Sequence, residues 1–149
     1  NVFFVLVNRN PADVIQSTMQ ASRDFFGTDE IIWGLRDDKS FDPVNYKDKL
    51  DAYCHQYLDL EDSIRKALNK LPAEDYTVVQ YEGFCEDPAT FQKEIMAKLK
   101  AKYELPDNYK GFGSSRHYTS RRLYDVKLAE EINRRIRDIR TTQKAVDAQ

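Results

Sequence analysis

The chain opens on an unbroken apolar run, residues 2–7. Strands that are apolar at every position are typical of parallel sheets covered by helices on both faces. We therefore predict a buried strand that ends near Val7. Because proteins rarely begin with such a strand, we expect this chain to be the later part of a larger α/β domain.

After this run the pattern changes to helical spacing. Asn10 is suited to cap a helix, Pro11 fits a first helical turn, and Gly27 is suited to end the helix. Between them, apolar and small residues recur every three to four positions, which predicts a helix with one buried face. The residues assigned to that face are Val14, Ile15, Thr18, Met19, Ser22 and Phe25.

The same patterns divide the rest of the chain. Residues 28–43 show no clean period and are predicted to be a loop or a lid-like insertion. A long helix is expected over residues 44–71, ended by Pro72, and a short strand over 77–81. A further helix is expected to begin at Asp87-Pro88. A final helix from about Asp125 is expected to turn Leu128, Ile132, Ile136 and Ile139 inward.

Strands that alternate with helices predict a parallel sheet flanked by helices on both faces. We expect residues 1–149 to form a single domain or part of one. A structural zinc site is not expected, because Cys54 and Cys85 lack Cys or His partners at metal-ligand spacing. No apolar run approaches the roughly 18 residues of a membrane-spanning helix.

Charge is unevenly distributed although the net charge is only −2. Residues 116–144 contain nine basic and four acidic residues, a local charge of +5. Such a stretch suits nucleic acid, an anionic substrate or a phosphate-bearing cofactor. It is equally typical of a solvated helix face rich in arginine.

Arg9 is the first residue with distinctive chemistry. It follows the predicted strand, and open parallel sheets bind ligands at the carboxyl ends of their strands. The next helix is expected to present unpaired N–H groups at the same edge. An arginine there can donate two parallel hydrogen bonds to a phosphate, and the Ser17 hydroxyl can add a neutral donor. The alternative is that Arg9 pairs with Asp13 while Ser17 faces solvent.

The pattern formed by Arg9, Pro11, Asp13 and Ser17 resembles the 3′-phosphate motif of sulfotransferases that use 3′-phosphoadenosine 5′-phosphosulfate (PAPS). Residues 78–88 are similar to that family's strand, turn and Asp-Pro helix start, with Gly83 where the family usually has an aspartate. The resemblance implies a P-loop-NTPase-like sulfotransferase fold, missing its N-terminal half. It also implies that Arg9 and Ser17 hold the 3′-phosphate and that Tyr81 lies near the adenine.

A later segment, residues 111–118, resembles in kind the loop with which sulfotransferases close over the cofactor. Arg116 is therefore a fourth candidate for the cofactor site, with Arg121 and Arg122 as competitors. Glycines and serines in this segment are also typical of an ordinary flexible loop.

The resemblance implies transfer of a sulfuryl group from PAPS to a hydroxyl or amine acceptor, with no metal. The chain contains no Gly-rich Lys-Ser/Thr segment of P-loop type, so we assign no catalytic residue and expect the phosphosulfate loop and the base to lie upstream of residue 1. The expected partners are the acceptor and that upstream half, not nucleic acid or membrane. The expected location is cytoplasmic, or Golgi-lumenal with an upstream anchor. Two alternatives stay open: a non-catalytic nucleotide- or anion-binding module, and a basic helical RNA-associated protein.

Overall fold

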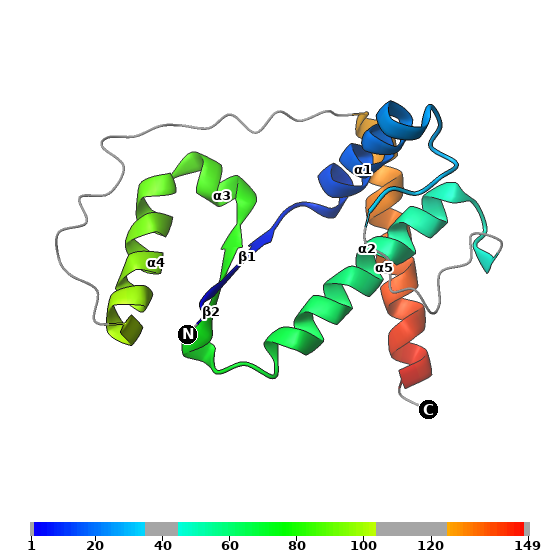
Figure 1. Cartoon of the computed structure of the whole chain (residues 1–149). Coiled ribbons are helices and arrows are strands. Elements are labelled where there is room, and N and C mark those ends of the chain that lie inside the picture. Colours follow the sequence, from blue (N-terminus) through cyan, green and yellow to red (C-terminus); the bar gives the residue numbers. More distant parts are fainter. Residues whose placement is uncertain (1, 35–44, 104–124, 148–149) are drawn as a thin grey trace. The chain divides into compact units, whose positions relative to one another are not determined.

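A computed structural model describes residues 2–34, 45–103 and 125–147 (Figure 1). The chain divides into two compact units, which we describe separately. The sheet unit comprises Asn1–Arg9 and Ala67–Arg121, and the helical unit comprises Asn10–Lys66 and Arg122–Gln149.

The sheet unit is built on two adjacent strands, β1 (Phe4–Asn8) and β2 (Tyr76–Gln80). They pair in parallel, in a register that runs from Phe4 opposite Tyr76 to Asn8 opposite Gln80. A 3-10 turn, η2 (Ala73–Asp75), precedes β2, and the helices α3 (Tyr81–Glu86) and α4 (Pro88–Tyr103) follow it. The parallel pairing of the two predicted strands is thus confirmed, whereas α3 was not predicted.

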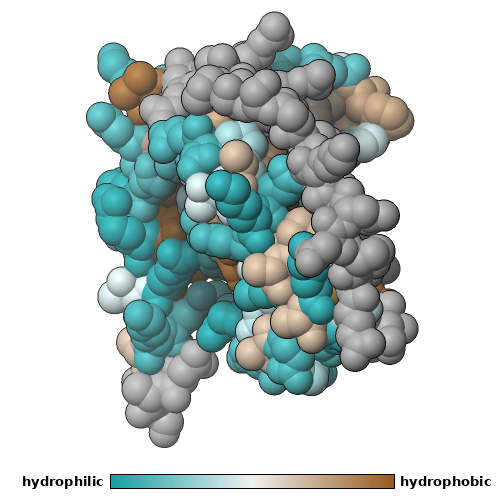
Figure 2. Space-filling model, turned by 90° about the vertical axis from the view of Figure 1, so that its left-hand side faces the viewer, coloured by the Kyte–Doolittle hydropathy of each residue, from teal (hydrophilic) through white to brown (hydrophobic). Residues whose placement is uncertain are grey.

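The apolar side chains of β1 are not buried as the sequence predicts. Phe4, Val5 and Val7 are 47%, 46% and 53% exposed, and on β2 only Val79 is buried. Among the coloured residues on the face drawn in Figure 2, hydrophilic ones prevail, and hydrophobic colour appears in small separate areas. The prediction of a strand covered on both faces is therefore wrong for the part of the chain that the structure describes.

The helical unit consists of α1 (Pro11–Phe26), α2 (Lys49–Leu68) and α5 (Val126–Asp147). These helices bury their apolar faces against one another, and Ile15, Tyr53 and Ile132 are almost fully buried in the shared core. Gln16 also joins α1 to the start of α5. Its carboxamide accepts a 3.1 Å hydrogen bond from the Asp125 amide and donates one of 3.4 Å to the Asp125 carbonyl.

The observed ends of α1 confirm the helix start and the helix end that were predicted from Asn10 and Gly27. Asn10 accepts a hydrogen bond from the Ala12 amide at 2.9 Å, and Gly27 ends the helix in a left-handed conformation with φ of 74°. The predicted inward face is correct for Ile15, Met19 and Ser22 and wrong for Phe25, which is 69% exposed.

The predicted fold class is wrong. Within residues 2–34, 45–103 and 125–147 the chain is mostly helical, and its sheet has only two strands. A P-loop-NTPase-like sulfotransferase fold needs a larger parallel sheet between helical layers, and that sheet is not evident here. The physical reason lies in the partners of the helices. The alternation of elements predicts their order along the chain, but within the helical unit α1, α2 and α5 bury their apolar faces against one another.

Candidate functional site

Two of the predicted site residues meet in the sheet unit. β1 ends at Asn8 and β2 ends at Gln80, and these two residues are register partners. The next residue of each strand is Arg9 and Tyr81, so parallel pairing delivers both side chains to one edge. The guanidinium carbon of Arg9 lies 4.9 Å from the centre of the Tyr81 ring. That distance is within the range of a cation–π interaction.

The backbone that carries the Tyr81 ring is held in a helix. Tyr81 begins α3, one residue beyond the strand in which the sequence pattern placed it. Cys85, only 4% exposed, lies one helical turn later, and interaction with its side chain raises the pKa of Tyr81. The ring therefore starts from the first position of α3 while one of its faces meets the guanidinium.

Ser17 lies on α1, in the helical unit, and its side chain is exposed. Its neighbours Thr18 and Ser22 donate to the carbonyls four residues earlier, at 2.9 and 3.1 Å. Among the residues that the structure describes, Ser17 makes no such bond, so its hydroxyl is available to a ligand. The convergence of Ser17 and Arg9 on a single phosphate stays a prediction, since the two residues belong to different units.

The first turn of α1 offers fewer donors than the sequence analysis expects. The Ala12 amide is bonded to the Asn10 side chain, and the Asp13 and Val14 amides are bonded to the Asn10 carbonyl at 3.0 and 3.1 Å. Pro11 has no N–H group. The expectation of unpaired N–H groups at this helix end is therefore wrong, and an anion here would depend on side chains.

The remaining cofactor candidate, Arg116, lies outside the described residues, as do its competitors Arg121 and Arg122. Their roles stay predictions.

The basic C-terminal stretch can be judged where α5 is described. Arg134 pairs with Glu131 and Asp138 at 2.7 and 2.9 Å, and Arg135 reaches Asp48 at 2.5 Å. A further 2.5 Å pair joins Arg140 to Glu61 on α2. Because carboxylates balance these arginines, α5 resembles a solvated, ion-paired face more than an RNA-binding surface. The RNA-associated alternative stays a prediction.

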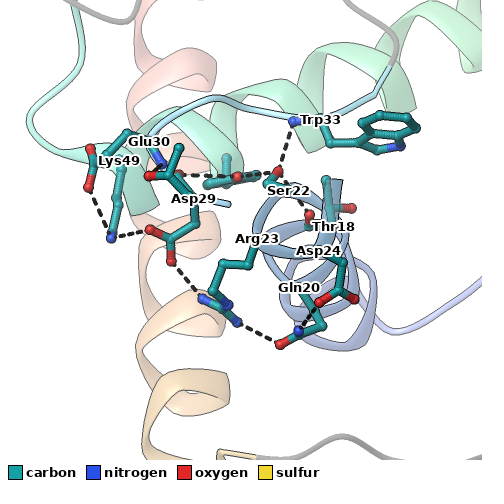
Figure 3. Close-up of polar contacts among 11 residues, drawn as sticks. Thr18, Gln20, Ser22, Arg23, Asp24, Asp29, Glu30, Trp33 and Lys49 are labelled. Carbon is teal, nitrogen blue, oxygen red and sulfur yellow. Dashed lines mark hydrogen bonds and ion pairs between the residues drawn. The ribbon is translucent and has the colours of Figure 1, made fainter. Parts of the chain in front are cut away.

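A polar network in the helical unit was not predicted (Figure 3). Ser22, which is fully buried, accepts a 2.7 Å hydrogen bond from the Tyr53 hydroxyl and a 3.0 Å bond from the Trp33 amide. Asp29 forms ion pairs of 2.6 Å with both Arg23 and Lys49. These bonds attach residues 29–33 to α1 and α2. The sequence indicated this network only through Ser22, a polar residue that shares the helical spacing of the apolar residues.

The ion pairs of this network have an electrostatic consequence. Hydrogen bonds from Lys49 and Arg23 lower the pKa of Asp29, and burial opposes that shift. The carboxylate is thus charged and balanced, which suits a structural role in holding the 28–34 segment. We assign no chemistry to it.

The described residues contain no group of three or more His, Cys, Asp or Glu side chains arranged to hold a metal ion. No helix in the described part of the chain is long and apolar enough to span a membrane.

Comparisons with family models, with curated proteins and with solved structures found no match to this chain. The resemblance to sulfotransferases therefore rests on the residue pattern alone and stays a prediction.

Proposed function

We propose that this chain binds 3′-phosphoadenosine 5′-phosphosulfate and serves in the transfer of its sulfuryl group to a hydroxyl or amine acceptor. The observation that carries the proposal is the contact of Arg9 with Tyr81 where two parallel strands end. Both residues were selected from the sequence as cofactor residues, although 71 residues lie between them in the chain.

The chemistry of Arg9 supports a phosphate ligand. A guanidinium is charged at all relevant pH values and presents N–H donors in a flat fork that matches two phosphate oxygens. Its place just beyond a parallel strand is where open sheets bind their ligands. The 3′-phosphate is the group that distinguishes PAPS and its product from common 5′-nucleotides, so a residue that selects it sets the cofactor preference.

The proposed reaction moves one sulfuryl group. The bond between sulfur and the bridging phosphate oxygen breaks as a bond forms between sulfur and the acceptor oxygen or nitrogen. A base takes the acceptor proton, and nearby cations stabilise the charge that develops on the leaving phosphate. The products are a sulfate ester or sulfamate and adenosine 3′,5′-bisphosphate, which keeps the 3′-phosphate. The bisphosphate is therefore a suitable probe of binding.

The test compares thermal stabilisation of the full chain by adenosine 3′,5′-bisphosphate and by 5′-AMP. A ligand that binds only the folded state raises the unfolding midpoint according to its concentration and affinity. We expect the bisphosphate to produce the clearly larger shift. Replacing Arg9 with alanine should remove most of that difference, at about 1.5–3 kcal/mol of binding free energy.

Arg65→Ala is the matched control, because Arg65 is an exposed arginine on α2 that pairs with Asp62 in the same helix at 2.8 Å. It should leave the difference between the two nucleotides unchanged. Equal shifts for both nucleotides with the unmodified chain would contradict the proposal.

A further inference from the structure

The contact between Arg9 and Tyr81 suggests a role for the tyrosine that the family resemblance does not give. The resemblance assigns Tyr81 to the adenine. In the structure one face of its ring is directed to the Arg9 guanidinium, at 4.9 Å. We propose, on the basis of the function proposed above, that Tyr81 is a positioning residue that orients the Arg9 fork toward the 3′-phosphate.

The geometry of a guanidinium makes this role specific. Its N–H donors lie in the plane of the group, whereas stacking on an aromatic ring uses the face. A ring beneath Arg9 therefore fixes the plane in which the donors point without consuming them. The attraction also restricts the long Arg9 side chain before phosphate binds. Less rotamer freedom is therefore lost on binding.

The ring can act as a support because it is itself held. Tyr81 is half-buried at the first position of α3, one helical turn before the buried Cys85. On the other side, pairing of Asn8 with Gln80 fixes the backbone from which Arg9 emerges. Both partners of the contact thus start from rigid backbone, which is the condition for preorganised binding.

The proposal separates two ways in which Tyr81 could influence binding. A residue that stacks on adenine affects every adenine nucleotide alike. A residue that acts through Arg9 affects only nucleotides with a 3′-phosphate. The measurable quantity is therefore the ratio of the dissociation constants of 5′-AMP and adenosine 3′,5′-bisphosphate, obtained for each variant of the full chain by calorimetry.

The variants are Tyr81→Leu, which removes the aromatic face, and Tyr81→Phe, which keeps it and removes the hydroxyl. For Tyr81→Leu we expect the ratio to fall roughly three- to tenfold, the size of a cation–π contribution. Tyr81→Phe should keep the ratio within about twofold, since phenylalanine offers a similar face. In an Arg9→Ala background, Tyr81→Leu should not change the ratio further, because the two residues act as a unit.

Far-ultraviolet circular dichroism of each unliganded variant shows whether it is folded. Should Tyr81→Leu fail to fold, Tyr81→Met serves in its place, because methionine is unbranched and adapts to irregular packing. The same fall in the ratio is expected. Weaker binding of both nucleotides by an equal factor, with the ratio unchanged, would overturn the positioning role and leave the proposed function in place. Absence of any preference in the unmodified chain would instead contradict the proposed function.

Discussion

Tyr53 donates a 2.7 Å hydrogen bond to Ser22 in the interior of the helical unit, across 31 positions of sequence. The same serine oxygen receives the Trp33 amide at 3.0 Å. One buried hydroxyl thus connects α1, α2 and the segment that follows α1. Burial raises the pKa of Tyr53, so the phenol is a neutral donor over the physiological range.

Replacing Tyr53 with phenylalanine tests this connection. The variant keeps the ring in the core and removes the donor, so we expect a loss of about 1 kcal/mol in the free energy of unfolding, measured with urea. Tyr76→Phe is the control, because the hydroxyl of this half-buried residue of β2 has no hydrogen-bond partner among the residues that the structure describes. It should change stability by only a few tenths of a kcal/mol. Equal losses in both variants would contradict the role of the Ser22 bond.

The ion pairs of α5 predict a response to acid. Hydrogen bonds from Arg134 and Arg135 lower the pKa of Glu131 to about 2, and Arg135 lowers the pKa of Asp48. Because both folded-state values lie below the ordinary carboxyl range of about 4, the pairs stabilise the fold fully above about pH 5. Their contribution is lost as the pH falls through that range toward 2.

Thermal unfolding midpoints at several pH values between 7 and 2.5 measure this loss. Arg135→Gln removes the partner shared by Glu131 and Asp48, so its midpoint should fall less steeply with acid than that of the unmodified chain. Parallel curves for the two proteins would show that these pairs do not contribute.

Two glycines are expected to respond oppositely to alanine. Gly27 has φ of 74°, and no atom of the described residues lies within 4 Å of an added Cβ. Gly27→Ala therefore introduces backbone strain and should cost about 1–2 kcal/mol. Gly83 lies in α3, and an added Cβ would be in ordinary contact with the Phe91 ring at 3.4 Å. Because alanine favours helix over glycine by about 1 kcal/mol, Gly83→Ala should be neutral or stabilising. Urea unfolding of both variants checks the contrast.

Local signals allowed part of the structure to be predicted. Asn10, Pro11 and Gly27 act on the backbone beside them, so the bounds of α1 could be expected from the sequence. The inward positions of α5 could be expected because Ile132 and Ile136 follow a helical period. Neither inference depends on what the rest of the chain does.

The predictions that are wrong concern burial and packing that depend on residues far away in the sequence. A continuous apolar strand predicts burial, but burial of Val5 and Val7 requires layers on both faces of the sheet, and the described residues leave both exposed. Phe25 has helical spacing but lies at the end of α1, where it packs with the exposed Trp33, at 4.4 Å between ring centres. The predicted fold class is wrong for the same reason, because the order of the helices and strands does not specify which of their faces pack together.

The candidate site was partly predictable. The adjacency of Arg9 and Tyr81 follows once the two strands are paired in parallel with Asn8 opposite Gln80. The position of Tyr81 at the start of α3 does not follow, because the sequence pattern placed Tyr81 in the strand.

The central claim is that Arg9 recognises the 3′-phosphate of an adenine nucleotide. Phosphorus nuclear magnetic resonance tests it most directly, because the two phosphates of adenosine 3′,5′-bisphosphate are observed separately in one titration. The account predicts that the 3′-phosphorus resonance shifts on binding, and that Arg9→Ala weakens this response far more than Arg65→Ala. A 3′-phosphorus resonance that does not respond to the protein, or that responds equally with Arg9→Ala, would contradict it.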